Sequence, residues 1–352
     1  MHTPLVARCL RGLEPLVAAE VVRSGLGAVT DLRHREVHFR ATRSAPPLRT
    51  ADDVFLLAAR SPDVGAARQA PRDLTALADR TDLDHLLPLR RPGAAPVCVD
   101  VSASFLGRRA FTRYDAEDAV GEALAQRLGV PYHSRRTGAA PPPGSCGWRL
   151  TLDGTQATLM LRVDDRPLHR RAYKRHTVPG TLHPPLAAAM AELAGIGPGQ
   201  TVVDPCCGAG TLLIEGALTR PDARFHGFDL SAQAVAAARA NAGDLPVTVR
   251  RCDAGRLPLP YGAADRVLCN PPWGAQVPAG GLLADAPERW WTELRRILSP
   301  DGAAVVLLPG RDDLAAALRH GFTPVHAQRL RLSGAQPFLV RMTVKDARRG
   351  RR

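Results

Sequence analysis

The chain has 352 residues, of which 45% are hydrophobic, and a formal net charge of +13 at neutral pH. This length predicts two or three domains, and the hydrophobic content is sufficient for buried cores. No stretch of the sequence reaches the roughly 18 apolar residues that a membrane span needs. Residues 1–10 lack the basic start and long apolar region of a signal peptide, so we expect a cytoplasmic protein.

The surplus of positive charge is typical of a protein with a polyanionic partner. Residues 101–180 carry 13 Lys and Arg against 7 Asp and Glu, and the densest basic run lies at 166–176. Codon bias in a GC-rich genome is a competing explanation, because the chain is rich in Ala, Arg, Gly and Pro and has two lysines. Such a bias replaces Lys by Arg but does not create a surplus of basic residues over acidic ones. We therefore favour nucleic-acid binding.

The cysteines do not suggest a disulfide framework or a metal site. They number seven, are scattered, and include an adjacent pair at Cys206 and Cys207. The sequence contains no CxxC motif, and no His and Cys residues have the spacing of metal ligands. We expect no metal.

The upstream half alternates short strands and helices, and residues 1–43 form a small α/β unit. The expected strands lie at 5–10, 28–33, 36–41 and 96–103. The expected helices lie at 13–25, 52–60, 71–89 and 114–129. A loop is expected at 135–147, followed by a hairpin at 148–164 that turns at Asp153 and Gly154.

The segment 204–211, with the sequence DPCCGAGT, follows an apolar strand expected at 201–203. Gly208 and Gly210 can adopt positive φ and let backbone N–H groups approach a ligand. Residues 211–215 then open a helix whose N-terminus faces the same crevice. This arrangement is the mouth of a doubly wound sheet.

The loop does not have the pattern of a nicotinamide-binding loop, which requires a third glycine where this chain has Leu213. Asp229 instead ends a second strand, about 20 residues after the loop, where a carboxylate can accept both ribose hydroxyls. Asp253 follows a third strand, at a position suited to an adenine amino group. A fourth strand ends at Asn270. Acids after three strands and an Asn-Pro-Pro-aromatic motif after the fourth are the layout of class I S-adenosylmethionine-dependent methyltransferases.

The motif NPPWG at 270–274 suits methyl transfer to an exocyclic amine. The lone pair of such an amine is delocalised into the ring, so the site must favour a tetrahedral nitrogen by accepting its two N–H groups. Asn270 offers a side-chain oxygen, and Pro271 offers a carbonyl that Pro272 keeps in an extended segment. Trp273 can stack on the base, which contributes roughly 1–3 kcal/mol for an unstacked base.

Each of these features has a simpler structural explanation when taken alone. A glycine pair after a strand is often a turn, Asn-Pro-Pro is usually a loop breaker, and strand-end aspartates are commonly solvated. Their shared order and spacing favour the functional interpretation.

The C-terminal part is expected to complete the sheet with a helix at 287–298, a strand at 302–309, a helix at 312–321 and strands at 325–332 and 337–345. We expect Trp290 and Trp291 to pack against this sheet rather than to contact substrate, because tryptophan is buried by default. We interpret Glu215 as part of the start of its helix.

The chain resembles the THUMP-containing RNA guanine-N2 methyltransferases, a group that includes tRNA position-6 enzymes and the N2-guanine half of a large-subunit rRNA enzyme. The residues that carry this resemblance are the segments 104–124, 168–190, 204–215 and 270–274. The likeness spans nearly the whole chain, and its catalytic motifs are its specific part. Relatives commonly have tyrosine or phenylalanine at the position of Trp273, which preserves stacking but leaves the target base open.

The resemblance implies an α/β fold with a ferredoxin-like domain at 1–60, an α+β THUMP RNA-binding domain at 61–165, a basic linker at 166–185, a Rossmann-like methyltransferase domain at 186–345 and a basic tail at 346–352. It implies that the base is held by Asn270, Pro271, Pro272 and Trp273. It implies that S-adenosyl-L-methionine is bound by Asp204, Cys206, Gly208, Gly210, Thr211, Asp229, Leu230, Asp253, Ala254 and Asn270. The predicted RNA contacts are Arg108, Arg109, Arg113, Arg170, Arg171, Lys174 and Arg175.

The predicted function is transfer of the methyl group of S-adenosylmethionine to the exocyclic N2 of a guanosine in structured RNA, with tRNA favoured and its acceptor-stem region as the target. The alternatives are guanine-N2 methylation of rRNA and N6-adenine or N4-cytosine methylation of DNA. Asn-Pro-Pro-aromatic motifs also serve glutamine methylation in proteins, which the basic upstream module disfavours. A further alternative is a non-enzymatic RNA-binding protein with a vestigial cofactor site. Such a protein would fail to bind the cofactor.

Overall fold

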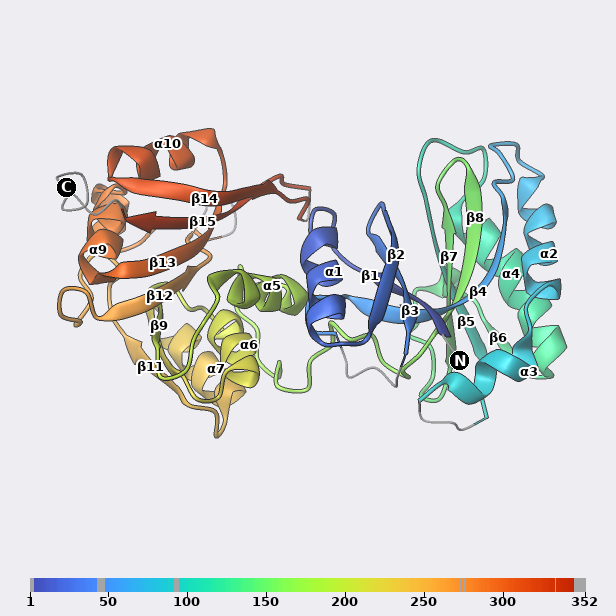
Figure 1. Cartoon of the computed structure of the whole chain (residues 1–352). Coiled ribbons are helices and arrows are strands. Elements are labelled where there is room, and N and C mark those ends of the chain that lie inside the picture. Colours follow the sequence, from blue (N-terminus) through green and yellow to red (C-terminus); the bar gives the residue numbers. More distant parts are fainter. Residues whose placement is uncertain are drawn as a thin grey trace. The chain divides into compact units, whose positions relative to one another are not determined.

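The computed structural model describes residues 3–42, 48–91, 95–272, 274, 277–332 and 334–344. Contacts between residues divide the chain into two compact units, one built mainly from residues 20–168 and the other mainly from residues 169–352 (Figure 1). Trp273 and the tail at 346–352 lie outside the described residues.

The N-terminal unit is built on an eight-stranded sheet with the order β2-β3-β1-β4-β8-β7-β5-β6. Its strands are β1 (Thr3–Arg8), β2 (Gly27–Arg33), β3 (Glu36–Ala41), β4 (Asp53–Pro62), β5 (Val99–Phe105), β6 (Tyr132–His133), β7 (Cys146–Leu152) and β8 (Gln156–Arg162). The helices of this half of the chain are α1 (Glu14–Arg23), α2 (Thr75–Asp79), α3 (Leu83–Leu86) and α4 (Arg113–Leu128), with short 3-10 turns η1 (Ala70–Leu74), η2 (Leu87–Leu89) and η3 (Arg135–Thr137).

Strand β4 joins the two predicted N-terminal modules into one sheet. It pairs with β1 on one side and with β8 on the other, both antiparallel. The strand order β2-β3-β1-β4 is that of a ferredoxin-like sheet. The boundary predicted between residues 60 and 61 falls inside β4, and the division into two domains stays a prediction.

The helix expected at 52–60 is wrong, because this segment forms strand β4. Val54, Phe55 and Leu56 are buried between the neighbouring strands, with at most 5% of their surface exposed. A short apolar run of this kind fits a helix or a strand, and its partners in the sheet decide the outcome. The helical stretch expected at 71–89 is present, divided between η1, α2, α3 and η2.

The C-terminal unit contains a seven-stranded sheet with the order β11-β10-β9-β12-β13-β15-β14. Its strands are β9 (Thr201–Asp204), β10 (Arg224–Asp229), β11 (Val247–Arg251), β12 (Ala264–Cys269), β13 (Leu298–Leu308), β14 (Phe322–Arg329) and β15 (Phe338–Val344). Neighbours from β11 to β13 are parallel, whereas β15 is antiparallel to both β13 and β14. This is the expected doubly wound sheet with a final antiparallel pair.

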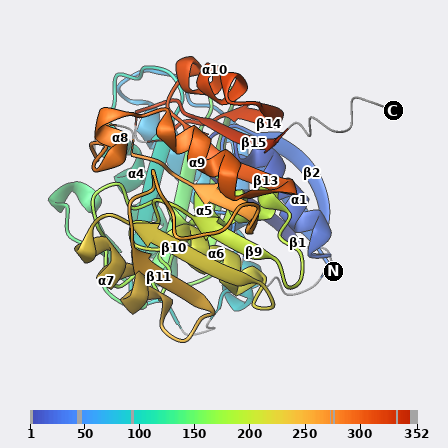
Figure 2. The ribbon, with the colours of Figure 1, turned by 90° about the vertical axis from the view of Figure 1, so that its left-hand side faces the viewer.

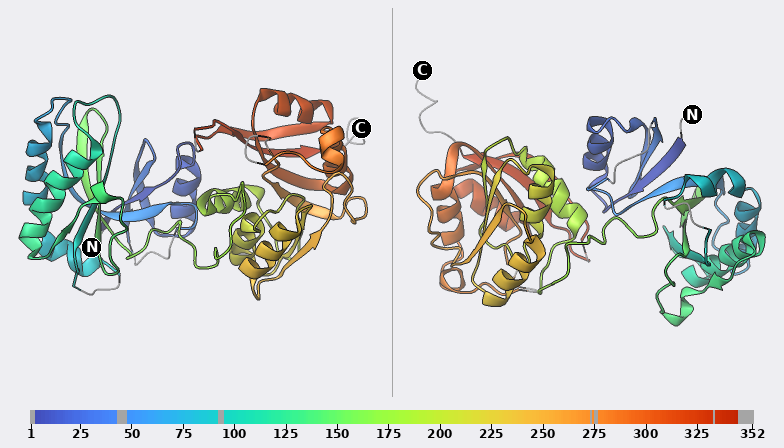
Figure 3. Two further views of the ribbon diagram at one scale, coloured as in Figure 1. Left: turned by 180° about the vertical axis from the view of Figure 1, so that it is seen from behind. Right: turned by 90° about the horizontal axis from the view of Figure 1, so that it is seen from below.

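Helices cover both faces of this sheet (Figure 2 and Figure 3). They are α5 (Pro184–Ala194), α6 (Thr211–Thr219), α7 (Ala232–Ala242), α8 (Leu282–Asp285), α9 (Arg289–Ile297) and α10 (Arg311–Arg319). Helices α5, α6 and α7 lie on one face, and α9 and α10 on the other, as the view from below in Figure 3 shows. Helices α5 and α8 were not among the sequence expectations.

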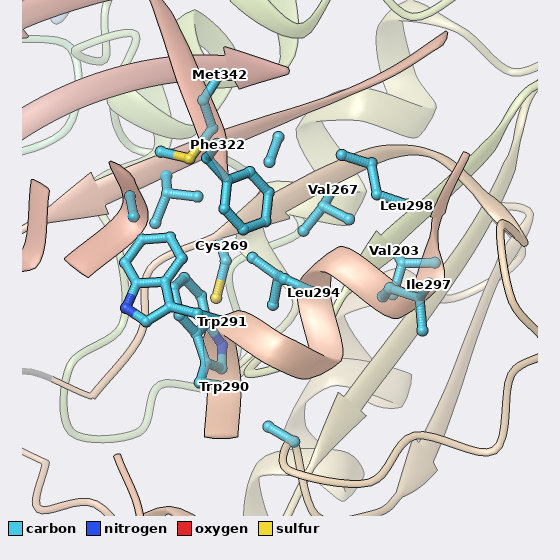
Figure 4. Packing of buried hydrophobic residues seen from close by; sticks show 14 of the residues in the cluster. Val203, Val267, Cys269, Trp290, Trp291, Leu294, Ile297, Leu298, Phe322 and Met342 are labelled. Carbon is cyan, nitrogen blue, oxygen red and sulfur yellow. The ribbon is translucent and has the colours of Figure 1, made fainter. Parts of the chain in front are cut away.

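Trp290 and Trp291 of α9 pack against the sheet, as predicted. Each is 5% exposed, and both lie in one apolar cluster with Cys269, Leu294 and Phe322 (Figure 4). The two indole rings meet edge to face at a centroid distance of 4.5 Å. Burying side chains of this size stabilises the fold by several kcal/mol, and this cluster packs α9 against β12, the strand that ends just before Asn270.

Candidate active site

The carboxyl ends of β9, β10, β11 and β12 meet at one edge of the C-terminal sheet because these strands are parallel. Asp204 and Asp229 are the last residues of β9 and β10, whereas Asp253 and Asn270 follow the ends of β11 and β12. The fold therefore brings together four polar side chains that are up to 66 residues apart in the sequence. In doubly wound sheets, ligands bind at this edge.

Asp204 is the most buried of the four, with 1% of its surface exposed. Its Oδ1 accepts the backbone N–H of Cys206 at 3.1 Å, and its buried Oδ2 has no hydrogen-bond partner in the described part of the chain. Burial, together with the nearby charge of Asp229, raises the pKa of Asp204 to about 8. An orphaned acceptor at this depth fits a ligand that brings a donor or a positive charge.

The glycine loop leaves space above this carboxyl group. Gly208 and Gly210 have φ values of +52° and +81°, which favour glycine. A methyl group on Gly208 would contact only Val178, at 3.8 Å, whereas one on Gly210 would lie 3.1 Å from Ala238. Thr211 then begins α6 and is buried. Because the N–H groups of Cys206, Cys207, Gly208 and Gly210 are donated within the protein, the loop offers a ligand the open space at Gly208 and the N-terminus of α6, which together form a cradle.

Asp229 is held firmly by the backbone on both sides. Its Oδ2 accepts the N–H of Gly208 at 2.9 Å, and its Oδ1 accepts the N–H of Ser231 at 2.8 Å. Each carboxylate oxygen has a further lone pair, so both can still accept a ribose hydroxyl. Asp229 therefore also ties the glycine loop to the end of β10.

Asp253 bridges two segments beyond β11. Its Oδ1 accepts the N–H of Gly255 and its Oδ2 accepts the N–H of Leu282, both at 2.8 Å. A methyl group on Gly281 would lie 2.0 Å from the same Oδ2, so this approach requires glycine. Leu230, which is 42% exposed, lies against this turn, whereas Ala254 is buried.

Asn270 lies directly after β12, with Pro271 and Pro272 half-buried beside it. Its Nδ2 donates to the carbonyl of Gly180 at 3.4 Å, which leaves Oδ1 available to accept a hydrogen bond from a ligand. Trp273, the predicted stacking partner, lies outside the described residues.

The structure adds a group of residues that the sequence interpretation missed. Asn241 of α7 is 5% exposed, and its Oδ1 accepts the N–H groups of Arg175 and His176 at 3.1 and 2.9 Å. Its Nδ2 donates to the carbonyls of His176 and Ala209 at 2.9 and 3.1 Å. One side chain thus fastens the basic segment to the glycine loop. A lone asparagine in a plain helix carries no sequence signal for this role.

Glu215 of α6 fastens the same segment at a second point. Its side chain is fully buried, and its Oε1 accepts from the Arg171 guanidinium at 3.0 Å and from the Tyr173 hydroxyl at 2.7 Å. Past these anchors, the chain reaches Val178, beside Gly208, and Gly180, which contacts Asn270. Residues 171–180 therefore form a strap beside the glycine loop and Asn270.

The predicted RNA contacts differ in how much of each side chain is accessible. Arg108, Arg113, Arg170 and Arg175 are exposed, and Lys174 is half-buried with its Nζ donating to the carbonyl of Leu182. Arg109 is different, because its guanidinium pairs with both Asp63 oxygens at 2.6 and 2.7 Å and its side chain is 4% exposed. Arg171 is committed to Glu215. We leave Arg109 and Arg171 out of the proposed RNA-contacting set.

The described ranges contain neither a candidate metal-ligand cluster nor a candidate membrane-spanning helix. Within these ranges, no group of three or more His, Cys, Asp or Glu side chains could hold a metal ion. No helix in the same ranges is long and apolar enough to span a membrane.

Comparison with known proteins agrees with this geometry. Residues 171–336 match the model of the RMKL-like methyltransferase domain. The chain is 34% identical over 244 residues to a tRNA (guanine(6)-N2)-methyltransferase of Thermus thermophilus, a match that covers 67% of this chain and 70% of that protein. It is 29% identical over 221 residues to a ribosomal RNA large subunit methyltransferase K/L of Photobacterium profundum, covering 48% of this chain and 30% of that protein.

A solved structure extends the likeness to both units. The crystal structure of TrmN from Thermus thermophilus superposes with a TM-score of 0.76 and 28% identity, covering 98% of this chain and all of that one. The sheet order and the glycine loop define a class I methyltransferase with S-adenosylmethionine as its cofactor, and the predicted fold class is confirmed. The chain belongs to the RMKL-like family of methyltransferases.

The burial of Asp204 generates a prediction about stability and pH. The folded protein retains the Asp204 proton up to about pH 8, whereas the unfolded chain releases it near pH 4. Stability of the cofactor-free protein should therefore fall as pH rises through this window, by up to about 1.4 kcal/mol per pH unit from this group. Urea unfolding at pH 5.5 and 7.5 should show a smaller fall for Asp204→Asn than for wild type. Equal falls in the two proteins would contradict this assignment, and the exposed Asp301→Asn variant serves as the control.

The strap generates a second prediction. Asn241→Ala removes four hydrogen bonds between the strap, α7 and the glycine loop. We expect affinity for S-adenosylmethionine to fall about tenfold or more, because an intact buried network of this kind contributes on the order of 1–3 kcal/mol. Isothermal titration calorimetry measures the loss, with the exposed Gln233→Ala on the same helix as control. Wild-type affinity in Asn241→Ala would show that the strap does not shape the cofactor site.

Proposed function

We propose that this enzyme transfers the methyl group of S-adenosylmethionine to the exocyclic N2 of a guanosine in RNA, with tRNA as the substrate. The observation that carries the proposal is the position of Asn270 and Pro271, directly after β12, at the sheet edge that also carries Asp204 and Asp229. The name of the Thermus relative, a tRNA (guanine(6)-N2)-methyltransferase that matches over 70% of its length, supports the base and the RNA class.

The residues of the cradle fit the proposed cofactor. Bound S-adenosylmethionine supplies an electrophilic methyl group on a positively charged sulfur. Asp229 holds the ribose, the glycine loop and the Asp204 carboxyl group line the methionine portion, and Asp253 with Leu230 and Ala254 borders the adenine. A positively charged ligand beside Asp204 would stabilise its ionised form and reverse the effect of burial.

The chain's own contribution to the reaction is to position the amine. Asn270 Oδ1 and the Pro271 carbonyl accept the two N–H groups of N2, which directs the nitrogen lone pair towards the cofactor side of the motif. Holding the reacting atoms in line supplies most of the rate gain, so no strong general base is required. The hydrogen bond from Asn270 to Gly180 fixes which end of the amide faces the substrate.

The RNA-contacting surface is proposed from the accessible cations alone. Arg108 and Arg113 lie before and at the start of α4, whereas Arg170 and Arg175 flank the anchored Arg171. Exposed guanidinium groups can contact phosphates, and binding through them should weaken steeply with salt. These four residues, with Lys174, form the proposed RNA-contacting set.

Ribosomal RNA is the second candidate substrate. The name of the Photobacterium relative, a ribosomal RNA large subunit methyltransferase K/L, supports it, although this chain covers 30% of that protein's length. Methylation of tRNA and of rRNA would be the same reaction at Asn270. The residues of the site therefore do not distinguish the two substrates, and an experiment must do so.

The catalytic motif generates a prediction that separates binding from chemistry. Asn270→Ala should lower the rate of methyl transfer to tRNA by about a hundredfold or more, because it removes an acceptor aimed at the reacting amine. Its affinity for S-adenosylmethionine should fall much less than the transfer rate, since Asn270 is one of ten residues predicted to bind the cofactor. Asp229→Ala should instead lose cofactor binding. Transfer of isotope label to tRNA and calorimetric titration of the cofactor measure the two quantities, and wild-type rates from Asn270→Ala would refute the proposal.

A further inference from the structure

A cavity of about 300 Å³ lies beside Pro271 and Pro272 in the C-terminal unit. It is bordered by the end of β13 and by residues of α9 and α10. Leu308 and Pro309 contribute to an apolar lining with the indole of Trp291. This volume is at the lower end of the roughly 300–1,000 Å³ typical of ligand sites, so it suits a single heterocyclic base.

One carboxylate on the wall of this cavity is not used by the fold. Asp312 in the first turn of α10 is exposed, and its side chain makes no hydrogen bond or ion pair within the described part of the chain. The neighbouring acids are committed elsewhere. Asp313 caps α10 by accepting the N–H of Gly310 at 3.1 Å, and Glu288 pairs with Arg319 at 2.6 Å.

A buried donor in the wall also has no acceptor. Trp290 lines the cavity and is 5% exposed, and its indole Nε1 finds no hydrogen-bond partner among the residues that the structure describes. A buried donor left in this state costs about 1–3 kcal/mol, which an acceptor on a ligand would recover. The cavity therefore combines a free carboxylate, an unused donor and aromatic walls beside the catalytic prolines.

These groups match the edge of guanine that adjoins its exocyclic amine. Guanine presents the N1–H donor between N2 and the O6 acceptor, whereas adenine presents an acceptor at N1. The Asn-Pro-Pro motif accepts from an exocyclic amine of either base, so it does not separate them. We propose that the cavity receives the target guanine and that Asp312 is a specificity-determining residue that accepts its N1–H. The inference rests on the proposed function.

The test compares two bases that share the 2-amino group. In synthetic tRNA, the guanosine that the wild-type enzyme methylates is replaced by 2-aminopurine, which keeps the 2-amino group but has an acceptor at N1. Wild type, Asp312→Asn and Asp301→Asn are assayed on both RNAs for kcat/KM with labelled S-adenosylmethionine. Asp301 is exposed and lies near the opposite end of β13 from Leu308, so its variant removes the same charge away from the cavity.

Asp312→Asn removes the negative charge and replaces one of the two acceptor oxygens with an amide group that can donate to N1 of 2-aminopurine. We expect kcat/KM on the guanosine RNA to fall on the order of tenfold to a hundredfold, while kcat/KM on the 2-aminopurine RNA rises. Asp301→Asn should behave as wild type. An unchanged preference in Asp312→Asn, or an equal loss on both RNAs with normal thermal unfolding, would overturn the inference.

The outcomes also separate this inference from the proposed function. If wild type methylates guanosine but Asp312→Asn keeps the wild-type preference, the proposed function stands and the role of Asp312 is refuted. If wild type labels no guanosine in any RNA, the proposed function fails, and the role of Asp312 fails with it.

Discussion

The site depends on one constraint, namely that four parallel strands end at the same edge of one sheet. This constraint places an orphaned buried carboxyl group, a glycine loop and a fixed carboxylate within reach of one ligand, and it places Asn270 beside them. Burial of Asp204 opposes ionisation of its carboxyl group, because a buried negative charge without a partner is costly. That cost is consistent with a site whose charge balance is completed by a cationic cofactor, since functional sites are where such perturbed groups gather.

The strap at residues 171–180 links this edge to the basic part of the chain. Glu215 and Asn241 hold it from two helices on the same face of the sheet, and Gly180 then contacts Asn270. The basic run therefore has two physical roles. Arg171 belongs to the scaffold, whereas Arg170 and Arg175 are exposed and belong to the proposed RNA-contacting set. Net charge alone does not separate these roles, because it counts a buried ion-paired guanidinium and an exposed one equally.

The catalytic half was predictable because its signals are local. Gly208, Gly210 and the acids at strand ends have fixed spacing, and apolar runs mark the strands between them. The segment at 52–60 was not predictable in this way, since its strand character comes from pairing with β1 and β8. The anchoring roles of Asn241, Glu215 and Arg109 also depend on residues more than 25 positions away. Contacts between residues so far apart in the sequence are set by the fold, and the sequence around each residue does not indicate them.

The central claim is that this site methylates the N2 of a guanosine in RNA. The most direct test is to incubate the purified protein with isotope-labelled S-adenosylmethionine and, separately, with unmodified tRNA, rRNA and DNA, and then to identify the labelled nucleoside by mass spectrometry. The account predicts N2-methylguanosine from tRNA. Label in N2-methylguanosine from rRNA alone would show that the substrate is rRNA rather than tRNA. Label in methylated adenine or cytosine, or in no nucleoside, would contradict the account.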